Sequence, residues 1–152
     1  MKAIVVIAAL MLLMLGLTFD GFAQKEERPA RLSTAALSRI LGIVLRAEFK
    51  PSTERKVVYL RAPSIRENSL PHITNTEFIL IDAAGLERIG KAYLFNRPMI
   101  QKGKVRVDFG YGSGCNASGG SYFFRIRGSR VTRTNDFGGW GTGCGSGTGT
   151  GH

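Results

Sequence analysis

The N-terminus constrains this chain more than any other part of its sequence. After Lys2, residues 3–17 form a run of fifteen apolar residues, and small residues lie three and one positions before Gln24. This order is typical of a secretory signal peptide. The run is shorter than the roughly 20 residues that span a bilayer, although a retained membrane anchor is the alternative. We therefore predict that residues 1–23 are cleaved and that the rest is exported, either secreted or periplasmic, with no transmembrane span.

The chain has a large surplus of positive charge. It carries 21 lysines and arginines against 11 acidic residues, for a net charge of +10. Cleavage would remove Lys2 and Asp20, so the net charge would stay the same. Such a surplus favours anionic partners, namely an anionic polymer, lipid headgroups or an acidic protein. The alternative is that the charge serves solubility alone.

The two cysteines, Cys115 and Cys144, predict a disulfide. An exported chain enters an oxidising compartment, where an even number of cysteines indicates pairing. A bond across a loop of this length would stabilise the fold by about 3–4 kcal/mol. The alternative is a reactive thiol, for which His72 and His152 are the only histidine partners in the sequence.

The remaining sequence indicates one domain, residues 32–144, preceded by a polar leader over residues 24–31. Ser33 is a candidate N-cap for a helix that runs to about Ala47. Apolar residues recur there at steps of three and four, which predicts one buried stripe made of Leu37, Ile40, Leu41, Val44 and Leu45.

Strand signals follow the predicted helix. Runs of β-branched and aromatic residues, or alternating patterns, occur at Lys56–Arg61, Glu77–Ile81, Tyr93–Asn96 and Lys104–Phe109. A short helix is a further possibility over residues 83–89. The strict alternation in Lys104–Phe109 predicts a half-buried antiparallel strand, with Arg106 among its outward-facing residues.

Residues 121–134 predict a β-hairpin. Gly128-Ser129 suits a two-residue type II′ turn, which has glycine first. In that register Arg127 lies opposite Arg130, and Arg125 lies opposite Thr132. One face would then carry Arg125, Arg127 and Arg130 with Phe123, and the other would carry Tyr122, Phe124, Ile126 and Val131 with Arg133.

The glycine-rich segments predict irregular structure. Residues 110–120 suggest a flexible loop between two strands, fixed at Cys115. Residues 145–152 contain little besides Gly, Ser and Thr, and we expect a flexible tail because nothing there offsets the ordering entropy. Trp140, with Phe137, is expected to pack on the rim of the sheet.

These elements predict an α+β fold, with one N-terminal helix on a curled antiparallel sheet of about four to five strands. The strand at Glu77–Asp82, the strand at Lys104–Tyr111, and the hairpin with Trp140 after it resemble the cystatin-like rolls. That group includes the nuclear-transport-factor-like domains of small exported proteins. The resemblance covers about half of the mature chain. These folds host both enzymes and binding modules, so the resemblance implies a fold and no particular activity.

The sequence contains no motif that predicts a catalytic, cofactor or metal site. Residues 112–117 match G-x-G-x-x-A, but a strand follows them where the dinucleotide fingerprint needs a helix. No serine has the spacing of a nucleophile elbow, and no cluster of His, Cys or acidic residues suits a metal. Asn116 begins a glycosylation acceptor sequence, which matters only in a eukaryotic host. If the roll encloses a pocket, its lining would include Tyr59, His72, Tyr93 or Tyr111.

The basic hairpin is the most specific functional feature of the sequence. Arginines crowded on one sheet face repel one another unless an anion joins them. The predicted anion-binding residues are therefore Arg106, Arg125, Arg127 and Arg130, and the alternative is a solvated face. The predicted function is a small exported, non-enzymatic binding module with a basic face. There are two other possibilities: a small enzyme that uses a pocket in the roll, and a secreted inhibitor or structural protein.

Overall fold

The structure, a computed structural model, describes residues 27–143. The predicted signal peptide, Cys144, His152 and the predicted tail lie outside the described residues. The fold is α+β, as expected. Besides a 3-10 turn at Glu67–Ser69, residues 27–143 contain two α-helices, α2 (Thr34–Glu48) and α3 (Ala83–Ile89). Its strands are β1 (Arg28–Pro29), β2 (Lys56–Arg61), β3 (Thr76–Leu80), β4 (Ala92–Phe95), β5 (Met99–Gln101), β6 (Lys104–Gly112), β7 (Ala117–Arg127) and β8 (Arg130–Thr142).

Helix α2 begins and packs as its sequence predicts. The Ser33 hydroxyl accepts a hydrogen bond from the Ala36 amide at 3.2 Å, which satisfies one of the free N–H groups of the first turn. The apolar stripe is buried against the sheet through Ile40, Leu41, Val44 and Leu45. With Leu60, Val107, Phe109 and Phe124 they form the main core.

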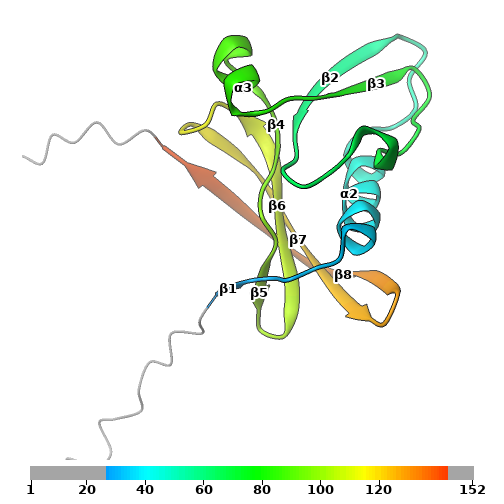
Figure 1. Cartoon of the computed structure of the whole chain (residues 1–152), viewed down its shortest axis with the longest axis vertical. Helices are drawn as coiled ribbons and strands as arrows, with labels where there is room; N and C mark the ends of the chain where they lie inside the picture. The colour runs from blue at the N-terminus through cyan, green and yellow to red at the C-terminus, as the bar shows by residue number, and fades with distance from the viewer. Residues whose placement is uncertain (1–26, 144–152) are drawn as a thin grey trace, which may run out of the picture.

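Strand β6 organises the sheet. One of its edges pairs with β7, which in turn pairs with β8. Its other edge pairs with β5 near residues 104–106 and with β4 near residues 109–112, so the sheet divides into two branches. Strand β1 extends the first branch, and β2 and β3 extend the second. Figure 1 shows α2 beside the long strands and α3 at the far end of the sheet.

The fold of the described residues differs from the predicted one-helix, antiparallel architecture in three respects. The sheet has eight strands in place of four to five, the helix that was only a possibility at residues 83–89 forms as α3, and β2 runs parallel to both β3 and β4. Parallel neighbours need a long crossover connection. Residues 62–75, with the 3-10 turn, connect β2 to β3, and α3 carries the chain from β3 to β4 on the other side of β2. Strands β1 and β5 contain only two and three residues, too few to show a periodic pattern. Because Arg28–Pro29 pairs with β5, the end of the predicted polar leader lies on the sheet.

The glycine-rich segment at residues 110–120 is mostly strand. Gly110 lies directly opposite Gly119 in the β6–β7 ladder. A Cβ at Gly110 would lie 2.2 Å from the Ser118 carbonyl oxygen, and one at Gly119 would lie 2.2 Å from that of Phe109. The glycines therefore allow an approach of the two backbones that no side chain permits, and the predicted loop shrinks to the turn at residues 113–116.

The sheet also has a smaller core on the face opposite α2. Leu86 of α3 is buried there with Ala92, Leu94 and Ala117, and Trp140 packs against them. The indole N–H of Trp140 donates a hydrogen bond to the Phe109 carbonyl at 3.3 Å. The expectation that Trp140 packs on the sheet is therefore confirmed, whereas Phe137 remains 65% exposed.

Candidate anion-binding site

The β7–β8 hairpin has the predicted register at its tip. Arg127 lies opposite Arg130, Ile126 opposite Val131 and Arg125 opposite Thr132. Gly128 has a φ of 56°, whereas Ser129 is not among the residues with positive φ, and these values fit the predicted type II′ turn. Further from the tip, Phe124 pairs with Arg133 and Tyr122 with Phe137, so β8 carries a bulge of two extra residues opposite Phe123.

The three hairpin arginines surround one surface hollow. It has a volume of about 210 Å³ and is lined by Arg125, Arg127, Arg130 and Thr132. We call it the hairpin hollow. All three arginines are exposed, and within residues 27–143 none of them takes part in an ion pair. Three arginines therefore line one hollow, and no acidic side chain among the described residues forms an ion pair with them.

Helix α2 supports the tip of the hairpin. Arg39, near the start of the helix, donates a hydrogen bond from its guanidinium group to the carbonyl of the turn residue Ser129. Figure 1 shows the tip beside the lower end of α2. The sequence does not predict that a fourth arginine lies near the tip, because only the tertiary fold brings Arg39 there. The periodicity of the helix indicates only that Arg39 lies off the buried stripe.

Arg133, on the opposite face of the hairpin, has different surroundings from the three arginines of the hairpin hollow. The guanidinium carbon of Arg133 lies 4.7 Å from the centroid of the Tyr122 ring, a cation–π contact. The exposed ring of Phe137 meets Tyr122 edge to face at 5.6 Å. Arg133 is thus held by aromatic groups, away from the hairpin hollow, on the face where the sequence places it.

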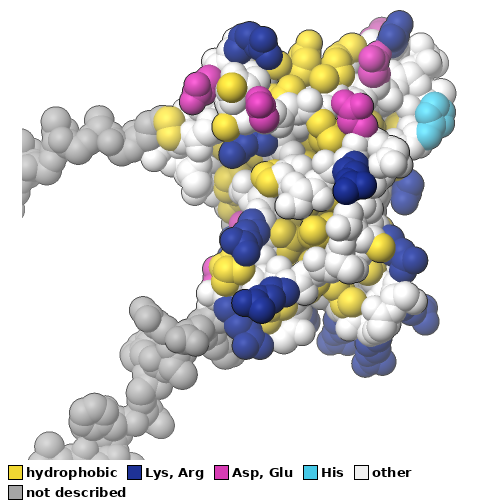
Figure 2. Space-filling model, in the orientation of Figure 1, with side chains coloured by type: hydrophobic (Ala, Val, Ile, Leu, Met, Phe, Trp, Pro, Cys, Tyr) yellow, Lys and Arg dark blue, Asp and Glu magenta, His cyan; other side chains and the backbone are white. Residues whose placement is uncertain are grey.

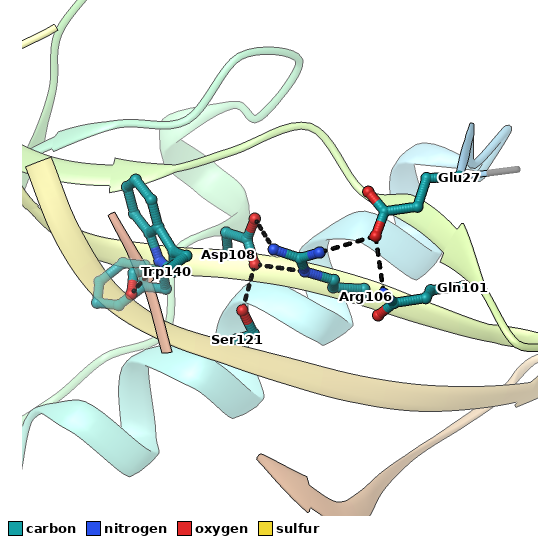
Figure 3. A network of polar contacts seen from close by, with 7 residues as sticks. Glu27, Gln101, Arg106, Asp108, Ser121 and Trp140 are labelled. Atoms are coloured by element: carbon teal, nitrogen blue, oxygen red, sulfur yellow. Dashed lines mark hydrogen bonds and ion pairs between the residues drawn. The ribbon is translucent and has the colours of Figure 1, made fainter. Parts of the chain in front are cut away.

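Arg106 does not share the surroundings of the hairpin arginines. Its guanidinium group donates two hydrogen bonds to the Asp108 carboxylate, at 2.9 and 3.1 Å, and one to Glu27 at 2.9 Å. Figure 3 shows how Gln101 binds the same Glu27 oxygen and Ser121 the same Asp108 carboxylate, at 2.7 and 2.6 Å. The hydrogen bonds to Asp108 raise the pKa of Arg106, although its partial burial opposes that effect. The donors of Arg106 are therefore occupied by acids, and the candidate site does not include it.

Charge is unevenly distributed over the face of the molecule that Figure 2 shows. In Figure 2 the acidic side chains gather in the upper part of the molecule, around α3 and the ends of β2 and β3. Lysine and arginine side chains dominate the lower part, where the β5–β6 turn and the β7–β8 hairpin lie. On this face the hairpin therefore lies in the more positive part, and such a concentration of charge attracts anions over a longer range than the local contacts do.

The cysteine prediction is untested, because Cys144 lies outside the described residues. Cys115 is in the turn between β6 and β7. Ala117, two residues after Cys115, pairs with Thr142, two residues before Cys144.

The four residues suggested as a pocket lining do not come together. Tyr59 is on the outer face of β2, whereas Tyr93 pairs with Leu60 and lies on the inner face. Tyr93 contacts Tyr111 at 5.0 Å between ring centroids, and its partial burial, with a smaller effect of Tyr111, raises the pKa of Tyr93. His72 is exposed near the start of β3. These positions offer no shared cavity for acid–base chemistry.

Among the described residues, no group of three His, Cys, Asp or Glu side chains is arranged to hold a metal ion. Nor is any helix within residues 27–143 long and apolar enough to cross a membrane. Comparison with known proteins finds no matching family model, curated protein or solved structure. The resemblance to the cystatin-like rolls therefore stays a prediction.

Proposed function

We propose that this protein is an exported binding module that holds an anionic polymer in the hairpin hollow. The observation that carries the proposal is the group formed by Arg125, Arg127 and Arg130, which line one hollow with no ion pair among the described residues. Directly opposed like charges destabilise a sheet, and Arg127 and Arg130 are directly opposed. A bound anion would remove that repulsion.

The chemistry of the three side chains favours phosphate or sulfate groups. A guanidinium group presents a planar fork of N–H donors that matches the oxygens of such groups in pairs. Arg125 and Arg127 are separated by one residue of β7, so their Cα atoms are about 6.6 Å apart and their side chains share a face. The Cβ atoms of Arg127 and Arg130, which are directly opposite each other, are about 5 Å apart. This spacing suits a chain of repeated negative charges better than a single small ion.

The support from α2 favours binding further. Because the contact between Arg39 and Ser129 holds the tip of the hairpin, less conformational freedom would be lost when the polymer binds. An exported module with this property would act at the cell envelope or outside the cell. Lipid headgroups and acidic proteins are the other anionic partners, and the experiment separates them from the polymer.

The test is retention of the purified protein on immobilised dextran sulfate across a series of salt concentrations. The variant changes Arg125, Arg127 and Arg130 to Ala. A matched control changes Lys50, Arg66 and Lys91, which are exposed and outside the ion pairs of the described residues, to Ala. Each arginine that contacts the polymer contributes about 1 to the slope of log affinity on log salt. We expect the magnitude of this negative slope to decrease by about 3 in the hairpin variant and by less than 1 in the control.

A second variant separates recognition by guanidinium groups from charge alone. Changing the same three arginines to Lys keeps the charge but removes the planar forks, so we expect weaker retention than in the unchanged protein. Equal slopes for the hairpin variant and the matched control would refute the site. Stronger binding to phosphatidylglycerol vesicles or to polyglutamate than to dextran sulfate would instead assign the hollow to lipid or to acidic protein.

A further inference from the structure

A second hollow lies where the start of α2 meets the connection between β4 and β5. It has a volume of about 590 Å³, within the range of about 300–1,000 Å³ that is usual for small-molecule sites. We call it the helix-start hollow. Apolar side chains of Leu32, Leu37 and Phe95 line it, and Phe95 is only 2% exposed. The hairpin hollow has no such apolar lining.

Two arginines flank the apolar lining. Strands β1 and β5 are antiparallel, with Pro29 opposite Met99, and the Ala30 amide donates a hydrogen bond to the Pro98 carbonyl at 2.9 Å. Arg31 follows Ala30 and Arg97 precedes Pro98, so the two arginines flank this contact in the chain. Both arginines are exposed and line the hollow, and neither is in an ion pair within residues 27–143.

All the charged side chains that line this hollow are positive. Its other lining residues include Ser64 and Asn96, which offer polar atoms, but no acidic residue. Two guanidinium groups that line one hollow repel each other unless an anion lies between them. The arrangement therefore has a place for one negative group, next to an apolar surface that remains partly open.

Ser64 supplies an independent sign of constraint at the same hollow. It has a φ of 70°, in the left-handed region that favours glycine. It is the third residue of a turn in which the Ile65 amide donates to the Ala62 carbonyl at 3.2 Å, with Pro63 before it. Glycine normally occupies this position of a type II turn. A strained residue with a hydroxyl group, at the rim of a hollow, suggests that the side chain has a function there.

We propose that the helix-start hollow binds a small amphipathic carboxylate. The carboxylate group would lie between Arg31 and Arg97 and accept hydrogen bonds from both. The apolar chain would lie over Leu32 and Leu37 with Phe95 beneath them. Neither feature alone would select this ligand, because arginines alone bind any anion and the apolar surface alone binds any hydrocarbon. This site is separate from the hairpin hollow and does not depend on the proposed polymer.

The test is calorimetric titration with octanoate at low salt and pH 7, with acetate and octanol as probes of the head and the chain alone. We expect octanoate to bind at least tenfold more tightly than either probe. Arg31→Ala and Arg97→Ala should each weaken octanoate binding at least fivefold. Both arginines are exposed, so the fold should persist, and circular dichroism of each variant checks this.

The variant with Arg125, Arg127 and Arg130 changed to Ala serves as the control, and it should bind octanoate like the unchanged protein. A site at the helix-start hollow is overturned if octanoate does not bind, or if both the Arg31→Ala and the Arg97→Ala variants bind octanoate as tightly as the unchanged protein does. It is also overturned if the hairpin variant loses octanoate binding as fully as they do. Because dextran sulfate retention is measured separately, failure of either proposal leaves the other to be judged on its own result.

Discussion

Arg106 and the hairpin arginines lie on the same face of one sheet, yet their surroundings differ completely. Arg106 pairs with Phe123 across the β6–β7 ladder, and Phe123 alternates with Arg125 and Arg127 along β7. The Arg106 side chain is only 21% exposed and contacts two carboxylates. The hairpin arginines are exposed and contact no carboxylate among the described residues.

This comparison shows that net charge is a poor guide to which cations are available to a ligand. In β6, Asp108 follows Arg106 by two residues and so lies on the same face of the strand, where it neutralises the guanidinium group. At the tip of the hairpin, the corresponding neighbours are other arginines and Thr132. We therefore expect Arg106 to contribute to stability and the hairpin arginines, which have no ion pair among the described residues, to be available to a ligand. The predictions below test that division.

The largest effect is expected from Arg106→Ala. The change would leave the Asp108 carboxylate, 20% exposed, without its bidentate partner, and we expect the free energy of unfolding to fall by about 2 kcal/mol. Urea denaturation measures this loss. Arg127→Ala, which removes a like-charge contact, should leave stability within about 0.5 kcal/mol of the unchanged protein. Similar losses in the two variants would end the distinction between the two regions.

A smaller effect, of opposite sign, is expected from Arg130→Glu. The new carboxylate would lie opposite Arg127, and such a cross-strand pair should stabilise the hairpin by about 0.2–1 kcal/mol. Retention on dextran sulfate should fall further than in Arg130→Gln, which removes the charge without pairing its neighbour. A variant that gained stability and kept its retention would show that Arg127 and Arg130 do not hold the polymer.

The smallest effect concerns acid stability and Asp136 of β8. A hydrogen bond from Lys104, followed by one from Thr134, lowers the pKa of Asp136. Its carboxylate therefore stabilises the fold above the unfolded-state pKa of about 3.9, and this contribution is lost as the pH falls through the lower folded-state value. Urea midpoints of Asp136→Asn and the unchanged protein should differ slightly at pH 6 and converge near pH 2. A constant difference over that range would exclude this role.

Much of the fold near the candidate site could be predicted from local sequence. The start of α2 at Ser33, the short helix at residues 83–89 and the paired positions at the hairpin tip all agree with the structure. Each depends on residues that are neighbours in the chain, through a cap, a periodic pattern or a turn. The pairing of Arg106 with Asp108 had a local signal as well, since two residues separated by one in a strand share a face.

The remaining features depend on segments far apart in sequence. Glu27 reaches Arg106 across 79 positions, and Arg39 reaches Ser129 across 90. The two-residue strand β1 exists only because β5 is beside it, and Arg31 and Arg97, which are far apart in sequence, line one hollow. No local pattern predicts such contacts, because their formation depends on which edges the sheet exposes once its long strands have paired.

The sequence by itself therefore determined the N-terminal helix, the central parts of the long strands, the register at the tip of the hairpin and the surplus of positive charge. Only the tertiary structure decided which of those charges are neutralised, which gather around a hollow, and how many strands join the sheet. The physical reason is the range of the interactions. Backbone propensity, capping and alternation act within a few residues, whereas ion pairing and sheet edges depend on the positions of the whole chain in space.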